Sequence, residues 1–149
     1  MMRFTRKLAL AVEAVLDIAY HASDMPVQSR EIAERQGVPR RYLEQVLQHL
    51  VRAEILRGVR GPRGGYRLAR ERRRIALGEI VRIVAELETA ESEPEEGSDL
   101  GNQVLTPIWR ELEDEAIRHL DAITIEDLCR KARSAGVEPG TRAQPDFTI

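Results

Sequence analysis

The arginine- and glycine-rich stretch at residues 57–70, RGVRGPRGGYRLAR, restricts the fold of this chain more than any other feature. Two segments, 55–59 and 66–69, alternate apolar and polar residues as short strands do, and residues 61–65 between them, GPRGG, have the composition of a hairpin tip. The spacings G-x-x-x-x-G-K-S/T and G-x-G-x-x-G of phosphate-binding loops are absent, and the strand-like flanks argue against a disordered basic segment. The stretch therefore predicts a basic β-hairpin.

Apolar residues at helical spacing predict three helices ahead of this hairpin, over about 7–21, 29–36 and 39–53. Gly37 ends the second helix where a left-handed residue is needed, and Pro39 suits the first turn of the third. Two short helices joined by a glycine-containing turn form a helix-turn-helix candidate. Followed by an arginine-rich hairpin, this pattern predicts a winged helix, whose third helix enters a DNA groove while the hairpin meets phosphates or a minor groove.

The charge distribution supports a polyanion-binding domain. Residues 1–86 hold 17 lysines and arginines against 10 acidic residues, a net of +7, whereas residues 87–149 hold 6 against 15, a net of −9. The overall charge of −2 therefore conceals a basic N-terminal part joined to an acidic C-terminal part. Eight arginines fall within the 18 residues 57–74, and this clustering favours nucleic-acid binding over a general coating of solvated helices.

The remaining composition limits the class of protein. No run of the sequence approaches the roughly 18 apolar residues of a membrane span or resembles a secretory signal, and the single cysteine, Cys129, excludes an internal disulfide. These features predict a cytoplasmic protein. A nucleophile elbow, a metal-spaced His/Cys set and a cofactor fingerprint are all absent, which predicts a protein that is not an enzyme.

Several motifs, in order along most of the chain, resemble the Rrf2 (IscR/NsrR/CymR) family of bacterial winged-helix transcription regulators. They are IAERQGVPRRYLEQVLQHL at 32–50, VRGPRGGYRLAR at 59–70, LGEIVRIV at 77–84, LTPIWRELED at 105–114 and LDAITIEDL at 120–128. The resemblance implies a mainly helical fold with a small β-hairpin, and double-stranded DNA as the partner. It divides the chain into a winged helix-turn-helix domain at 1–86, an acidic loop at 87–103, a dimerisation helix with a following helix at 104–134, and an extended tail at 135–149.

Matching to the S-Y-L-E-Q region of the family places the DNA-reading residues at the start of the third helix. They are Arg40, Arg41, Tyr42, Glu44 and Gln45. Glutamate can accept from the cytosine amino group, glutamine can pair with adenine, and arginine can bind guanine through two bonds. Glu44 and Gln45 could instead belong to an ordinary exposed helix face. Pro39, Arg40 and Arg41 stand where the family often has small polar residues, so the operator sequence stays open.

The hairpin and the N-terminus supply further expected DNA contacts. Arg60 and Arg63 should meet the backbone or the minor groove, and Arg3, Arg6 and Lys7 should add phosphate contacts near the first helix. Tyr66 either anchors the base of the hairpin or belongs to the core.

The resemblance also implies a homodimer in which a long helix after the hairpin carries the interface. The sequence has an apolar stripe at helical spacing there, made of Leu105, Ile108, Trp109, Leu112, Ala116, Leu120 and Ile123. A helix of that length needs a partner to cover its stripe. The stripe could pack on its own domain, but a symmetric dimer suits palindromic half-sites.

Members of this family often hold an iron–sulfur cluster on cysteines of the loop that corresponds to 87–103. This loop has no cysteine, and Val104 and Pro107 stand where the family's C-L-T-H run supplies a cysteine and a histidine. Cys129 lies far downstream and cannot replace three thiolates. We therefore expect no iron–sulfur cluster, no other cofactor and no metal. The acidic residues of the loop could attract a hard cation, but they lack a calcium-binding spacing.

The chain ends on Asp146, Phe147, Thr148 and Ile149, which resemble the C-terminal peptide by which serine acetyltransferase enters the active site of cysteine synthase. The cluster-free, CymR-type relatives regulate cysteine and sulfur metabolism with this enzyme. The resemblance therefore predicts a repressor of sulfur-assimilation genes that cysteine synthase binds through residues 146–149. Two alternatives stay open: a protein-interaction adaptor on a winged-helix scaffold, and a regulator that senses an unknown small ligand.

Overall fold

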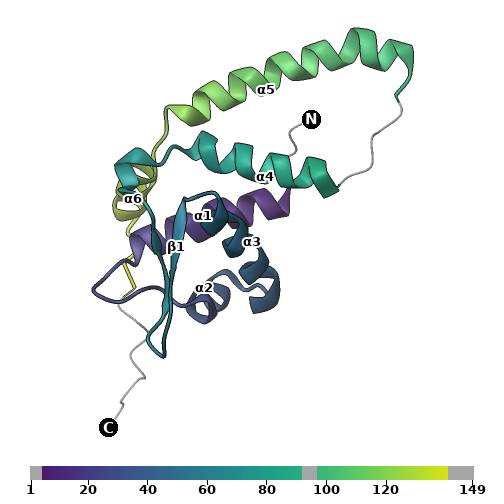
Figure 1. Cartoon of the computed structure of the whole chain (residues 1–149). Coiled ribbons are helices and arrows are strands. Elements are labelled where there is room, and N and C mark those ends of the chain that lie inside the picture. Colours follow the sequence, from purple (N-terminus) through teal and green to yellow (C-terminus); the bar gives the residue numbers. More distant parts are fainter. Residues whose placement is uncertain (1–4, 92–96, 141–149) are drawn as a thin grey trace.

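The structure is a computed structural model that describes residues 5–91 and 97–140 (Figure 1). Its elements, in chain order, are α1 (Arg6–Tyr20), α2 (Ser29–Gln36), α3 (Arg40–Arg52), β1 (Leu56–Val59), β2 (Gly65–Leu68), the 3₁₀ turn η1 (Arg72–Arg74), α4 (Leu77–Glu91), the π-helical turn η2 (Gly101–Leu105), α5 (Thr106–Asp121) and α6 (Ile125–Ser134). The predicted fold class, mainly helical with a small β-hairpin, is confirmed. No helix within the described ranges is long and apolar enough to cross a membrane.

Local residue chemistry accounts for the ends of the helices. The Thr5 side chain accepts a hydrogen bond from the Leu8 N–H at 3.2 Å and so caps α1. Gly37 ends α2 in the left-handed conformation, at φ 65°, which glycine adopts without a steric penalty. Pro39 precedes α3 as its N-cap residue in an extended conformation, one position earlier than the sequence predicted. Thr124 and Asp127 form a reciprocal capping box that starts α6.

One apolar core joins α1 to the helix-turn-helix, to α4 and to α6. Ile18 from α1, Ile32 from α2, Leu47 from α3, Ile80 from α4 and Ile125 from α6 are all almost fully buried in it. The core is largely aliphatic, because aromatic residues make up only 4% of the chain. It holds α2 and α3 in a fixed relation to the hairpin.

The hairpin pairs Leu56 with Leu68 and Val59 with Gly65 in antiparallel register. A third extended segment joins it, because Val27 and Tyr66 exchange two backbone hydrogen bonds of 3.0 and 2.8 Å. Gly65 permits this approach: a Cβ at that position would lie 2.5 Å from the Val27 carbonyl oxygen. The segment that leads into α2 is thereby tied to the base of the hairpin.

Helix α4 packs along α1, and α5 contacts α4 and then diverges from it (Figure 1). Arg82 of α4 makes a bidentate ion pair with Asp121 at the end of α5, at 2.8 and 2.6 Å. Gly78 lies under the same carboxylate, where a Cβ would be only 2.0 Å from Asp121 Oδ1. These contacts fix the angle at which α5 leaves the domain.

The acidic segment is shorter than the loop predicted at 87–103. α4 continues to Glu91 and contacts both α1 and α5. At the other end, η2 already begins at Gly101, where the Thr106 backbone N–H and hydroxyl both bond to the Gly101 carbonyl. Residues 92–96 lie outside the described ranges.

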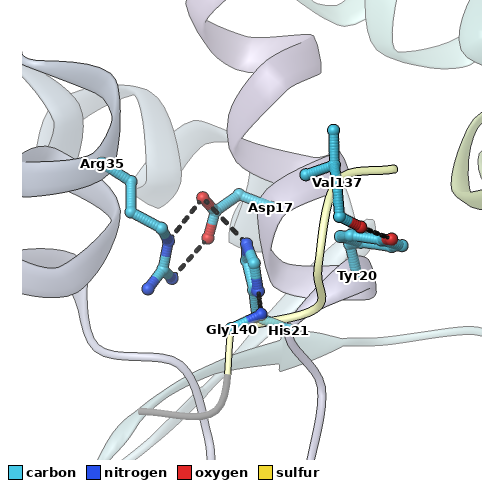
Figure 2. Close-up of polar contacts among 6 residues, drawn as sticks. All are labelled: Asp17, Tyr20, His21, Arg35, Val137 and Gly140. Carbon is cyan, nitrogen blue, oxygen red and sulfur yellow. Dashed lines mark hydrogen bonds and ion pairs between the residues drawn. The ribbon is translucent and has the colours of Figure 1, made fainter. Parts of the chain in front are cut away.

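The segment after α6 turns back onto α1. Gly136, at φ 79°, redirects the chain, and the following residues, 137–140, form no helix. The Tyr20 hydroxyl donates to the Val137 carbonyl, and the Gly140 N–H donates to His21 Nδ1 at 2.5 Å (Figure 2). We call residues 137–140 the strap. The rest of the predicted tail, 141–149, lies outside the described residues.

Candidate nucleic-acid interface

Helix α3 and the hairpin enclose a groove of about 940 Å³. Its charged lining residues are Arg30, Arg40, Glu44 and Arg60, so three cations face one anion. The glycines of the hairpin tip line the other side and leave the backbone accessible. A groove with a positive lining and an accessible backbone suits a phosphate-bearing partner.

Helix α3 has one buried and one exposed face, as its sequence pattern predicted. Leu43, Val46, Leu47 and Leu50 are buried, and this orients Arg40, Arg41 and Gln45 toward solvent. Of the residues predicted to read bases, Arg40 and Glu44 line the groove, whereas Arg41 and Gln45 are exposed beside it. Tyr42 is half-buried and packs against the core, so much of its ring has a structural role.

Three side chains join α2 to α3 at the floor of the groove. The buried Ser29 hydroxyl donates to Oε1 of Glu44 at 3.1 Å, and Arg40 Nε lies 3.0 Å from the same oxygen. Arg40 Nε also lies 3.2 Å from the Ser29 oxygen. The carboxylate of Glu44 is therefore held in one orientation in the chain alone. The i,i+4 spacing of Arg40 and Glu44 was visible in the sequence, but the part of Ser29 was not.

The hairpin presents its arginines in two ways. Arg60 lines the groove, and Arg63 is exposed at the tip, in a turn closed by a 2.9 Å bond from the Gly64 N–H to the Gly61 carbonyl. Gly61 has φ 113°, a conformation that other residues rarely adopt. Of the two predicted arginines, Arg60 thus lines the groove, and Arg63 is exposed at the hairpin tip.

Tyr66 combines the two roles that the sequence left open. Its half-buried ring packs against the core, and its hydroxyl accepts a hydrogen bond of 3.4 Å from Gln48 Nε2 of α3. Burial raises the pKa of the Tyr66 hydroxyl. Gln48 also lines the groove and was not among the predicted contacts, because it lies about one helical turn beyond the S-Y-L-E-Q region at 41–45.

The predicted N-terminal contacts do not line the groove. Arg6 and Lys7 lie at the start of α1, next to Thr5, whose hydroxyl donates to Glu88 of α4. Arg6 is exposed and Lys7 is half-buried. Arg3 lies outside the described residues.

The predicted dimerisation stripe divides into two halves. Leu105, Ile108, Trp109 and Leu112 are 43–53% exposed, which is unusual for large apolar side chains on one helix. Ala116, Leu120 and Ile123 are half-buried, and Leu120 packs against the core of its own domain. Packing on its own domain, one of the two sequence expectations, is therefore seen for Leu120, and the exposed half stays a predicted dimer interface.

Ligands for a metal are not gathered at the start of α5. Val104 lies in η2 and Pro107 in the first turn of α5. Cys129 is 1% exposed on α6, and burial raises the pKa of its thiol. Across residues 5–91 and 97–140, the structure has no cluster of three or more histidine, cysteine or acidic side chains suited to a metal ion.

Comparison with known proteins agrees with this arrangement. A family model described as Rrf2, an iron-dependent transcriptional regulator, matches residues 4–131. The HTH-type transcriptional regulator IscR of Yersinia pseudotuberculosis serotype O:1b (strain IP 31758) is 39% identical over 129 residues, which are 85% of this chain and 79% of that protein. Similar solved structures include T. potens IscR, with a TM-score of 0.72, 33% identity and 93% of each chain covered. Another is CymR, described as the global cysteine regulator of B. subtilis, with a TM-score of 0.68, 27% identity, and 88% of this chain and 98% of that one covered.

The relatives named in these comparisons are transcriptional regulators and not enzymes. The family match spans residues 4–131, and the identity to IscR covers 85% of the chain. The chain belongs to the Rrf2 family of transcriptional regulators.

Proposed function

We propose that this chain is a homodimeric, sequence-specific DNA-binding repressor that works without an iron–sulfur cluster. The observation that carries the proposal is the groove between α3 and the hairpin, where Glu44 is held by Arg40 and Ser29 opposite Arg60. An oriented carboxylate can discriminate between bases, and the arginines supply affinity for phosphates. Repression follows if the operator overlaps a promoter.

The proposed dimer rests on the exposed half of the α5 stripe. Ile108, Trp109 and Leu112 are large, apolar and about half exposed, and α5 leaves the domain at an angle fixed by the pair Arg82–Asp121. Packing α5 against α5 of a second copy would bury this face. Two α3 helices related by a twofold axis would then meet two half-sites of a palindromic operator.

The residues present do not fit the cluster that the family description implies. The chain has one cysteine, which is buried on α6, where burial raises the pKa of its thiol, and Val104 and Pro107 carry no ligand atom for iron. A cluster requires several thiolate or imidazole ligands converging on one place. This proposed regulator therefore takes its signal from another source.

The terminal sequence and one structural relative favour a role in sulfur metabolism. Asp146, Phe147 and Ile149 resemble the serine acetyltransferase tail, and the similar B. subtilis CymR is described as a cysteine regulator. A terminal carboxylate can occupy a backbone N–H cradle built for an amino acid, with the Ile149 side chain beside it. Pull-down by cysteine synthase of the full chain, but not of a chain lacking Ile149, is the expected result, and O-acetylserine should dissolve the complex. If cysteine synthase captures both chains equally, or captures neither chain, the proposed binding through the terminal residues is contradicted.

DNA binding itself is tested by selection from a random duplex pool at about 150 mM salt, where nonspecific affinity is weak. A regulator should enrich one inverted repeat with half-sites about one helical turn apart, or a multiple of it. An adaptor on the same scaffold would enrich no sequence.

A further inference from the structure

A second cavity, of about 810 Å³, lies where α1, the hairpin, η1 and α6 meet. We call it the wing-base cavity. Its walls come from four separate elements and from Pro139 of the strap, which α1 holds through Tyr20 and His21 (Figure 2). Its volume falls within the range of small-molecule sites, about 300–1,000 Å³.

The lining of the wing-base cavity is strongly cationic. It contains Arg57, Arg67, Arg70, Arg72, Arg73 and Arg133, against only Glu71 and Glu126. Six positive charges facing two negative ones favour an anion in a partly enclosed site. Arginine is also the side chain best suited to carboxylates and phosphates, because its planar donors bind them in pairs.

In the part of the chain that the structure describes, three of the six arginines form ion pairs with acidic side chains, and the other three do not. Arg72 and Arg73 pair with Glu126 and Glu71, and Arg70 pairs with Glu79. Arg67, in contrast, donates only to uncharged acceptors, the backbone carbonyls of Ser23 at 3.0 Å and Asp24 at 2.6 Å. Within the described residues, Arg57 and Arg133 have no acidic group within 4.0 Å.

The rest of the lining is apolar. Ile18 and Val27 are already buried beneath this lining, whereas Ala22 is exposed and Met25 and Leu68 are half-buried, so these three still offer apolar surface to the cavity. A purely inorganic ion would leave this surface uncovered, whereas a ligand with a hydrocarbon body would bury it. The arginines and the apolar wall together match an organic anion, namely a carboxylate or a phosphate ester with a compact apolar part.

Tyr66 connects this cavity to the DNA groove, because it lines both. Its backbone pairs with Val27 ahead of α2, and its hydroxyl accepts from Gln48 on α3. A ligand that shifts the strand around Arg67 would therefore shift a residue bonded to α3 and to the segment that leads into α2.

We propose that the wing-base cavity is an effector site for a small organic anion, and that occupation of it changes DNA affinity through Tyr66. The proposal rests on the proposed DNA-binding function. It supplies the signal input that a chain without cluster ligands needs. Because coupling between two binding sites is reciprocal, DNA must alter the affinity for the anion by the same factor.

The test uses the full chain and three probes in calorimetry: 2-naphthyl phosphate, 2-naphthol with the same body but no charge, and inorganic phosphate without the body. Naphthyl phosphate should bind one per chain, at least about tenfold more tightly than either control probe. The double variant R57Q/R133Q should bind naphthyl phosphate about tenfold or more weakly than the wild type. R60Q, in the DNA groove, and R52Q, exposed on α3, should leave the affinity unchanged.

The second measurement is operator affinity with and without saturating naphthyl phosphate. At a probe concentration that just saturates the wild type, the expected change is about fivefold or more in the wild type and clearly smaller in R57Q/R133Q. Three outcomes would overturn the proposed site. They are naphthol binding as tightly as naphthyl phosphate, R57Q/R133Q binding naphthyl phosphate as tightly as the wild type, and loss of naphthyl phosphate binding in R60Q. Unchanged operator affinity at saturation would overturn the coupling. Failure of the proposed DNA-binding function is distinct, because it would appear as a lack of operator binding without any probe.

Discussion

Arg40 and Glu44 lie one helical turn apart on α3, and the Arg40 guanidinium donates to Oε1 of Glu44 across 3.0 Å. The buried Ser29 donates to the same oxygen from α2. The contact is exposed enough to water to add little stability. In the proposed base-reading role of Glu44 the contact has a functional consequence, because a carboxylate that is already oriented loses less conformational entropy when it binds.

Replacing Glu44 by alanine should relax base discrimination at one position of each half-site. The expected loss is about 1–3 kcal/mol between the best and second-best base, measured on a set of single-base operator variants. Overall affinity for phosphates should persist, because Arg60 and Arg63 remain. Glu34→Ala, which removes an exposed carboxylate of α2 outside the groove, serves as the control. Uniform weakening on all sequences by Glu44→Ala would contradict a role in base readout.

Leu112→Glu should convert the proposed dimer into monomers. Leu112 is 53% exposed in the single chain and central to the stripe with Ile108 and Trp109. A buried carboxylate there should weaken dimerisation by about 2 kcal/mol or more, a factor of about 30, in sedimentation equilibrium. Arg118→Glu, also exposed on α5 but off the stripe, should stay dimeric. If Leu112→Glu sediments as the wild type does, the interface lies elsewhere.

Gly65→Ala should loosen the hairpin from the rest of the domain. The added Cβ would meet the Val27 carbonyl oxygen at 2.5 Å and its carbon at 2.7 Å, so a backbone must move. The expected cost is about 1–3 kcal/mol in urea unfolding, with weaker operator binding. Gly58→Ala is the matched control on the paired strand, because no atom lies within 4 Å of its Cβ. Equal stability of the two variants would show that the Val27–Tyr66 pairing does not constrain the hairpin.

The strap contact should make stability depend on pH through His21. Burial, as the largest cause, lowers the pKa of the His21 imidazole below its ordinary value of 6.5, although Asp17 opposes the shift and Arg35 adds to it. Nδ1 accepts from the Gly140 N–H only while it carries no proton. The contribution of His21 and its bond to the stability of the fold is therefore fully present above pH 6.5, and it is lost as the pH falls from 6.5 through the lowered pKa of the folded state.

In urea unfolding at pH 7.5 and 5.5, the wild type should lose more stability on acidification than His21→Gln. His119→Gln, exposed on α5, should behave as the wild type does. If His21→Gln loses as much stability on acidification as the wild type does, the pH dependence of stability arises from other groups.

The sequence predicted local features well and long-range contacts poorly. Helical spacing located α2 and α3, and the composition of GPRGG located the hairpin tip, because both depend on neighbouring residues. Contacts such as Val27 with Tyr66 and Ser29 with Glu44 join residues far apart in the chain, and no local pattern specifies them. The loop predicted at 87–103 is longer than the segment between α4 and η2, because its acidic composition gives no apolar pattern by which the end of α4 and the start of η2 could be recognised.

The wing-base cavity was missed for the same reason. In the sequence, Arg67, Arg70, Arg72 and Arg73 belong to one cluster of eight arginines at 57–74, which predicts nucleic-acid binding and no separate anion site. Only the fold shows that some of them face α1, α6 and Pro139 across an apolar wall. The chemistry of a site assembled from four elements cannot be derived from the order of residues in any one of them.

The central claim, that the groove between α3 and the hairpin binds DNA sequence-specifically, is tested most directly by the salt dependence of affinity. The affinity of the wild type and of Arg63→Ala is measured between about 50 and 200 mM salt on the selected operator and on a scrambled duplex of the same length. The wild type should prefer the operator by about 10³-fold or more throughout, and the logarithm of affinity should fall linearly with the logarithm of salt concentration. Arg63→Ala should lower affinity on both duplexes and reduce the slope by about one for each lost phosphate contact. Coincident lines for operator and scrambled duplex, or an unchanged slope in a folded Arg63→Ala chain, would contradict the account.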